Sequence, residues 1–189
     1  TNGDKRIVLW AYFQYGVEVY RDIDEDYDGK ADQYRWLNTG GTRWGLDEDE
    51  DGQINRWKQI SAEEVSAEVV AAIRDANPER FAALLISEKE IEGLGLGEAK
   101  QERITVKADR AARDFGSMAK RQKAIGPQAR WVQFAASPPG VVPTGTDGST
   151  KDVVVSDNAV AMFEQDDRSG QLLVGTLIRV GNAWRMVEL

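Results

Sequence analysis

The spacing of hydrophobic and polar residues changes near Ile60. Before that residue, aromatic and β-branched side chains alternate with polar ones, as from Tyr12 to Tyr20 and from Tyr34 to Trp36. A period of two in these residue types is typical of β-strands. Gly40-Gly41 predicts a turn in the middle of this region. The first 60 residues are therefore expected to form a small β unit.

After Ile60 the hydrophobic period lengthens to about 3.6 residues, which predicts helices. Ser61-Ala-Glu-Glu64 is a capping box, and Asn77-Pro78 supplies a helix cap followed by a proline in the first turn. Glycines from Gly93 to Gly97 separate a short helical turn from a long, charge-rich helix. The expected helices cover 61–75, a segment starting at 77, 87–92 and 98–123, the last with an interruption near Gly116.

The last third of the chain alternates again and contains turn residues such as Asp157-Asn158, Asp166-Asp167 and Gly181-Asn182. The expected antiparallel strands are 130–135, 152–155, 159–164, 171–180 and 183–187. The predicted fold class is α+β. A β unit over 1–60 precedes an α+β domain over 61–189, with helices in 61–125 and an antiparallel sheet in 129–189.

Acidic residues are concentrated in two short segments of a chain whose formal net charge is −8. Asp22 to Asp32 contains five Asp and one Glu against one Lys, and Asp47 to Gly52 contains three Asp and two Glu. The remainder of the chain is slightly basic. It has no stripe of Lys and Arg interleaved with aromatic residues, so nucleic acid is not an expected partner.

Residue types that are absent narrow the possible chemistry. The chain has neither Cys nor His, which removes thiol nucleophiles, the usual zinc ligands and the commonest general base. Six Trp and a hydrophobic content of 41% favour a folded core over disorder. No apolar run approaches the roughly 20 residues that span a bilayer, so membrane insertion is not expected.

The two acidic segments are copies of one motif. Asp24-Glu-Asp-Tyr-Asp-Gly29 and Asp47-Glu-Asp-Glu-Asp-Gly52 align at an offset of 23 residues. Ca²⁺ takes six to eight oxygen ligands, and Asp at alternate positions before a Gly bend supplies several of them from one loop. The sequence predicts two calcium ions, one held by Asp24, Asp26, Asp28, the Lys30 carbonyl and Asp32, the other by Asp47, Asp49, Asp51, the Gln53 carbonyl and Asn55.

The twelfth loop position separates these loops from EF-hands. A bidentate Glu is expected there, but Arg35 and Lys58 occupy it, and the flanking residues have no helical period. The form D-x-D-x-D-G-x-x-D between strands resembles the calcium loops of integrin-type FG-GAP repeats. The missing ligand predicts an affinity in the weak extracellular range, about 10⁻⁴ to 10⁻³ M. Duplication and like-charge repulsion disfavour the simpler interpretation as solvated Asp-Gly turns.

Longer passages carry two further resemblances. The passages 18–24, 31–38, 43–47 and 57–64, together with Pro139 to Asp152, resemble the N-terminal region of exported bacterial thioredoxin-like (redoxin) proteins. The chain has no Cys-x-x-Cys, so no redox chemistry is carried over. Helices followed by a curved sheet that ends at Gly175 to Val187 are similar to the cystatin/NTF2-like group, whose catalytic members often use an Asp-His pair that is absent from this sequence.

These observations predict a non-catalytic, calcium-binding structural or interaction module of an exported or envelope protein. The expected partner is a neighbouring domain of a longer chain or another envelope protein. The alternative is a small-molecule-binding or hydrolytic NTF2-like pocket built from carboxylates of the C-terminal sheet. A filled, apolar sheet face favours the first function, and a deep cavity with two close carboxylates favours the second. The candidates for that pocket are Asp152, Asp157, Glu164 and Glu188.

Overall fold

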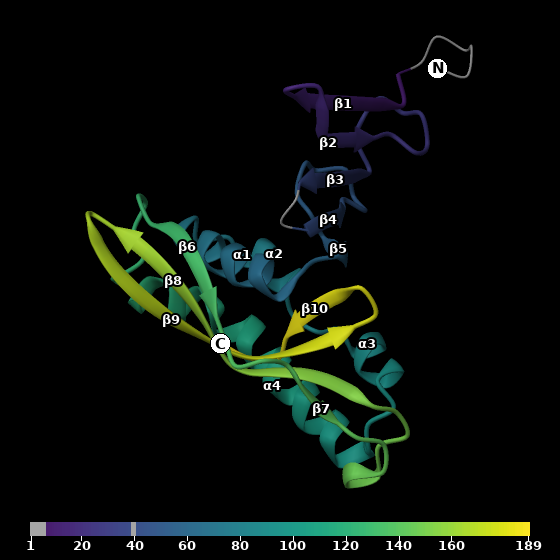
Figure 1. Ribbon diagram of the computed structural model, residues 1–189, viewed down its shortest axis with the longest axis vertical. Coiled ribbons are helices and arrows are strands. Elements are labelled where there is room, and N and C mark those ends of the chain that lie inside the picture. Colours follow the sequence, from purple (N-terminus) through teal and green to yellow (C-terminus); the bar gives the residue numbers. More distant parts are fainter. Residues whose placement is uncertain (1–6, 39–40) are drawn as a thin grey trace.

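Two antiparallel sheets joined by helices make up the computed structural model, which describes residues 7–38 and 41–189 (Figure 1). The predicted α+β class is confirmed. The turn predicted at Gly40-Gly41 falls partly on Gly40, which lies outside the described residues.

The N-terminal sheet is a meander in which the strands follow one another in sequence order, β1-β2-β3-β4-β5. It projects from the rest of the molecule, with β5 nearest the helices (Figure 1). Its two long connections, between β2 and β3 and between β4 and β5, are the Asp-rich loops. The strands are β1 (Leu9–Gln14), β2 (Val17–Ile23), β3 (Gln33–Asn38), β4 (Gly41–Leu46) and β5 (Arg56–Gln59).

A row of aromatic rings crosses this sheet and joins it to the core. Successive ring centroids are 5.3 Å apart for Tyr12 and Tyr20, 5.2 Å for Tyr20 and Trp36, and 5.7 Å for Trp36 and Trp57. Aromatic neighbours at these separations attract one another beyond their buried area. Trp57 is only 3% exposed and belongs to the main hydrophobic core. The row therefore runs from an exposed end at Tyr12 to a buried end at Trp57.

The helices form where the caps predict them. Ser61 and Glu64 make a complete capping box at the start of α1 (Ala62–Arg74), and the Asn77 side chain accepts the Arg80 N–H at the start of α2 (Pro78–Ala82). A short α3 (Glu88–Gly93) follows. The helix α4 (Glu98–Arg121) is continuous, so the predicted interruption near Gly116 is wrong. A helical Gly costs about 1 kcal/mol relative to Ala, and burial of the adjacent Phe115 outweighs that cost.

The C-terminal sheet has the order β10-β9-β8-β6, and β7 also pairs with β8. Its strands are β6 (Arg130–Ala135), β7 (Gly140–Val142), β8 (Val153–Gln165), β9 (Arg168–Val180) and β10 (Ala183–Met186). The two strands predicted at 152–155 and 159–164 are one strand, β8. Asp157-Asn158 forms a bulge instead of a turn, because the Asp157 carboxylate accepts the Thr176 hydroxyl of the paired strand (2.9 Å). The predicted tight turn at Asp166-Asp167 is present.

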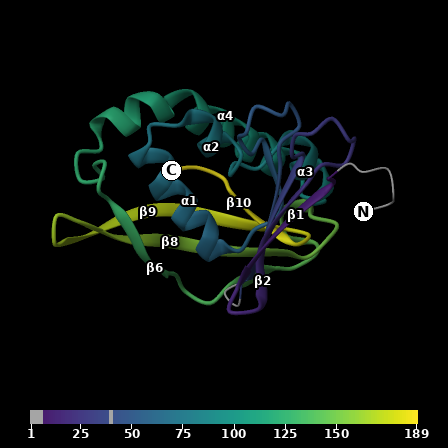
Figure 2. The same cartoon turned by 90° about the horizontal axis from the view of Figure 1, so that it is seen from above.

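The helices all lie on one face of the C-terminal sheet (Figure 2). Val65 and Val69 of α1, together with Ala159, Val174 and Leu177 of the sheet, are fully buried in one cluster. Phe81 and Phe115 stack at 4.3 Å and connect α2 to α4. The sheet face beneath α1 is thus filled with apolar side chains.

Residues of β10 fasten the end of the meander to this body. The Trp184 N–H donates to the Ile60 carbonyl (2.9 Å), and Ile60 is fully buried. Arg185, which is 3% exposed, donates to the Trp57 carbonyl and to Glu90. Burial lowers the pKa of this guanidinium from its usual value. The first sheet is therefore attached through β5 and the residues that follow it.

Phe81→Ala should lower the free energy of unfolding by about 3–5 kcal/mol, because it removes a fully buried ring and leaves a cavity against Phe115. Urea unfolding followed by circular dichroism measures the change. Leu173→Ala is the matched control, since Leu173 is 60% exposed and its loss should change stability by no more than about 0.5 kcal/mol. Equal effects of the two substitutions would contradict the position of the core.

Candidate metal centre

The two Asp-rich loops share several backbone features. The Asp32 N–H donates to the Ile23 carbonyl (2.9 Å), and at the equivalent place in the second copy the Asn55 N–H donates to the Leu46 carbonyl (2.8 Å). The bends at Gly29 and Gly52 have φ values of 97° and 86°. Glycine adopts this left-handed conformation without strain. The sequence repeat is thus also a structural repeat.

The fourth position of each loop is left-handed as well, although neither residue there is glycine. Tyr27 has φ 72° and Glu50 has φ 56°. Non-glycine residues in this region cost on the order of 1–2 kcal/mol. The same unfavourable conformation in both copies shows that the loop path, and not the individual side chain, determines it.

The first Asp of each loop is buried and held by the backbone of its own loop. Asp24 is 3% exposed and accepts the N–H groups of Tyr27 (2.7 Å) and Gly29 (2.9 Å). Asp47 is 2% exposed and accepts those of Asp51 (3.2 Å) and Gly52 (2.9 Å). An ionised carboxylate has about four acceptor positions. Each group therefore keeps at least one for another partner, although Asp47 also accepts the Tyr34 hydroxyl.

Most of the predicted carboxylates converge. Oxygens of Asp24, Asp26 and Asp32 lie within 4.8 Å of one another, as do those of Asp47, Asp49 and Asp51. Asp28 instead groups with Asp26 and with Glu50 of the second loop. Glu50 was not predicted from the sequence. The equivalent residue of the first copy is Tyr27, so the repeat contains no signal for it, and only the packing of one loop beside the other brings it close.

The remaining predicted residues lie at the ends of the loops. Asp32 and Asn55, at the ninth position, accept the N–H groups of Glu25 and Glu48 through their side chains. Lys30 and Gln53 were predicted to act through their backbone carbonyls. The Lys30 side chain donates to Glu50 (3.0 Å), and that of Gln53 donates to Asp51 (3.0 Å).

The side chains at the twelfth loop position, Arg35 and Lys58, both contact Trp44. The Arg35 guanidinium lies 3.9 Å from the centroid of Trp44, and the Lys58 ammonium lies 4.3 Å from it. Cations at this distance from an indole are attracted by the ring. The two residues that replace the EF-hand Glu thus contact the same tryptophan of β4.

Tyr34 reports on the charge of the second loop. Its hydroxyl donates to Asp47 Oδ2 (3.3 Å). Burial, followed by the charge of Asp47 and this hydrogen bond, raises the pKa of Tyr34 to about 12. The neutral phenol is therefore favoured in the folded state.

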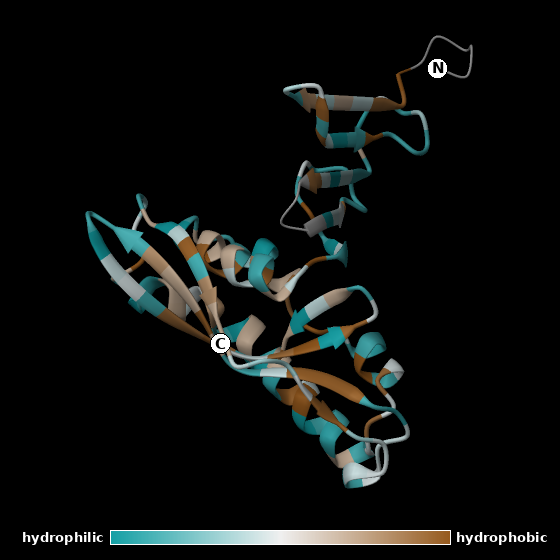
Figure 3. Cartoon of the chain, in the orientation of Figure 1, coloured by the Kyte–Doolittle hydropathy of each residue, from teal (hydrophilic) through white to brown (hydrophobic). Residues whose placement is uncertain are grey.

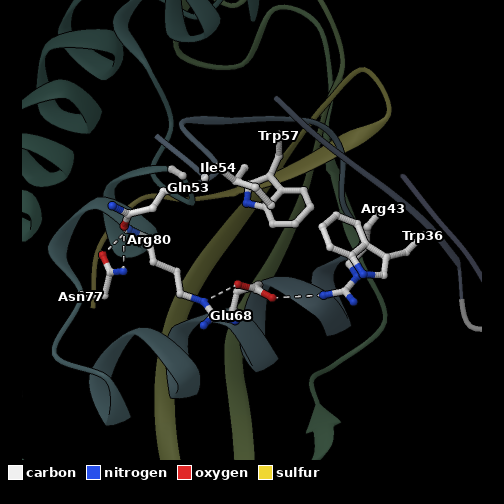
Figure 4. Close-up of a pocket in the computed structure, with 10 residues that line it drawn as sticks. Trp36, Arg43, Gln53, Ile54, Trp57, Glu68, Asn77 and Arg80 are labelled. Carbon is white, nitrogen blue, oxygen red and sulfur yellow. Dashed lines mark hydrogen bonds and ion pairs between the residues drawn. The ribbon is translucent and has the colours of Figure 1, made fainter. Parts of the chain in front are cut away.

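A cavity of about 410 Å³ lies where the second loop meets the helices (Figure 4). At its floor Glu68, which is 6% exposed, pairs with Arg43 of β4 (3.1 Å) and Arg80 of α2 (2.7 Å). The Asn77 side chain donates to Gln53 of the loop (3.2 Å). These polar groups are directed at one another, and Arg43 also covers the Trp36 ring at 4.6 Å. The residues that line the cavity therefore connect the N-terminal sheet to the helices.

The carboxylates considered for an alternative pocket lie on separate elements and have partners of their own. Asp152 accepts from Thr144 and Asp157 from Thr176. Glu164 pairs with Arg130, and Glu188 pairs with Lys107. The sheet face that such a pocket needs is filled by α1.

No known protein family, curated protein or solved structure matches the chain. Among the helices of the described residues, none has the length and apolar character needed to cross a bilayer.

The absorbance of the Tyr34 phenolate, obtained as the difference between wild type and Tyr34→Phe, should titrate near pH 12. The raised pKa contributes stability that is complete below pH 10, the usual pKa of tyrosine, and is lost as the pH rises toward 12. Asp47→Asn should move the titration toward lower pH, because it removes the charge that opposes ionisation. If the Asp47→Asn substitution leaves the pKa of Tyr34 unchanged, Tyr34 does not lie against the loop.

Proposed function

We propose that this chain is a calcium-binding structural or interaction module in which each Asp-rich loop holds one Ca²⁺. The observation that carries the proposal is the matched geometry of the loops. In both, a buried Asp held by backbone N–H groups lies beside two further carboxylates, all within 4.8 Å. Carboxylates so close repel one another strongly unless a cation lies among them.

The donor set selects the type of ion. The chain offers carboxylate, amide and carbonyl oxygens and contains no His or Cys, which excludes the usual zinc ligands. Ca²⁺ accepts irregular sets of six to eight oxygens, whereas Mg²⁺ requires a small, near-octahedral site. The first ion would be held by Asp24, Asp26, Asp28 and Asp32 with the Lys30 carbonyl, and the second by Asp47, Asp49, Asp51 and Asn55 with the Gln53 carbonyl.

The ions would act on structure and not on a reaction. Each loop connects two neighbouring strands of the meander, so a bound cation draws their ends together and cancels the repulsion among the carboxylates. Without a twelfth-position Glu the expected affinity is weak, about 10⁻⁴ to 10⁻³ M, as in extracellular modules. That range suits an exported or envelope protein, in agreement with the resemblance to FG-GAP loops and exported redoxin-like chains. The proposed partner is a neighbouring domain or another envelope protein.

Calcium should raise the melting temperature of the chain, because it binds only the folded loops. For a dissociation constant of about 0.1–1 mM, 10 mM calcium contributes about 1.4–2.7 kcal/mol per ion. For a chain of this length, that corresponds to a rise of several degrees. Differential scanning calorimetry in calcium, magnesium and EDTA measures it, and magnesium should give the smaller effect.

Paired substitutions test the site itself. Asp26→Asn with Asp49→Asn removes one converging carboxylate from each loop and should abolish most of the calcium shift. Glu102→Gln with Asp109→Asn is the matched control, since it neutralises two exposed carboxylates on α4. The proposal is wrong if millimolar calcium leaves the melting temperature of the wild type unchanged. It is also wrong if both double variants retain the calcium-induced shift.

A further inference from the structure

The β1–β2 hairpin projects away from the body (Figure 3). Six exposed large hydrophobic residues lie on this hairpin or just before it. They account for more than half of the large hydrophobic side chains exposed in the described part of the chain. Successive side chains of a strand point to opposite faces, so Leu9 and Phe13 lie on one face of the hairpin, and Tyr12 and Val17 lie on the other. Both faces of the hairpin therefore expose apolar surface, which can mark a contact site. The residues are Ile7, Leu9, Tyr12, Phe13, Tyr15 and Val17, which are 43% to 97% exposed.

The hairpin tip carries the most exposed of these residues in a strained conformation. Tyr15 is 97% exposed with φ 51°, and Gly16 follows with φ 80°. A two-residue turn with positive φ at both positions favours Asn, Asp or Gly. An aromatic residue there contributes nothing to the turn, and strain of this kind points to a function outside the local fold.

Within the described residues, no strand pairs with the outer edge of this hairpin. β1 is the first strand of the sheet, and among the described strands it pairs only with β2. Natural edge strands are usually protected by charged residues, proline or a bulge. β1, with the sequence LWAYFQ, contains neither charge nor proline, and the bulge of the pair places its extra residue, Val19, on β2. The N–H and C=O groups along this edge can therefore pair with another strand.

We propose that a second copy of the chain docks on this edge, with the two β1 strands pairing antiparallel about a two-fold axis. Such a contact requires a surface that is complementary to itself. An uncharged strand meets this requirement, because no like charges face each other. The aromatic row that starts at Tyr12 would continue into the partner. The acidic loops of the same sheet disfavour an anionic membrane as the occupant.

The exposed surface is large enough for a stable contact. An aromatic side chain buries about 150–250 Å², so the exposed fractions of Tyr12, Phe13 and Tyr15 represent on the order of 400 Å². The three aliphatic residues and the strand edge bring the surface toward the roughly 800 Å² that each partner contributes to a standard interface. This inference does not depend on whether the loops bind calcium.

Sedimentation velocity of the whole chain in calcium, from about 1 to about 200 µM, tests the proposal. The 21.0 kDa monomer should convert to a dimer as concentration rises. Phe13→Lys places a charge on the edge and should raise the dimer dissociation constant at least about ten-fold. Leu173→Lys is the matched control. Leu173 is 60% exposed on β9 of the other sheet, compared with 64% for Phe13, and its substitution should leave the dimer unchanged.

Three results would overturn the proposal: a wild type that stays monomeric at the highest concentration, a Phe13→Lys variant that associates like wild type, or a dimer lost through Leu173→Lys instead. Circular dichroism confirms that each variant is folded.

Single cysteines give a second readout, because the chain has no Cys of its own. Under mild oxidation one of Leu9→Cys, Ala11→Cys and Phe13→Cys should form a covalent dimer, whereas Val141→Cys should not. Equal cross-linking at all four positions, or cross-linking at none, contradicts the pairing of β1 strands.

Discussion

Repulsion among carboxylates is the constraint on which the N-terminal sheet depends. Two unit charges about 4–5 Å apart repel by roughly 1 kcal/mol in water and by several times more near a protein surface, and each loop brings three such groups together. The backbone N–H groups that hold Asp24 and Asp47 offset part of this energy. Arg35 and Lys58 carry positive charges, but their cationic groups lie against the Trp44 ring. The calcium ions proposed above would cancel the rest of this repulsion.

The two loops have unequal positions in the molecule. The first contacts the rest of the chain through the meander, and Lys30 links it to the second loop. The second contacts the helices directly, because Gln53 joins Asp51 to Asn77, the residue that caps α2. Beside it the buried carboxylate of Glu68 ties Arg43 of the sheet to Arg80 of the helix. A disturbance of the second loop therefore reaches the body, whereas one in the first loop reaches it only through the intervening strands.

Local signals in the sequence were sufficient for much of this structure. The capping box at Ser61 and the cap at Asn77 place two helix starts correctly, and the Asp-Gly repeat places both loops between strands. Contacts between distant residues were not predictable in the same way. Glu50 joins the first loop only because the loops pack side by side, and β8 continues through Asp157 because Thr176 of another strand supplies its partner. The continuous helix at Gly116 likewise depends on the burial of Phe115 in the core.

The first five strands lie side by side in sequence order. Their stability against local opening is therefore expected to increase from β1 to β5. In the part of the chain that the structure describes, each of these strands pairs only with its neighbours in sequence. The free energy of opening is therefore expected to accumulate strand by strand from the outer hairpin toward the buried Trp57, as in linear repeat proteins. Fraying would begin at β1 and stop at whichever loop is most tightly closed. With the proposed calcium ions in both loops, the calcium concentration around the protein would set how far the meander opens from its outer end.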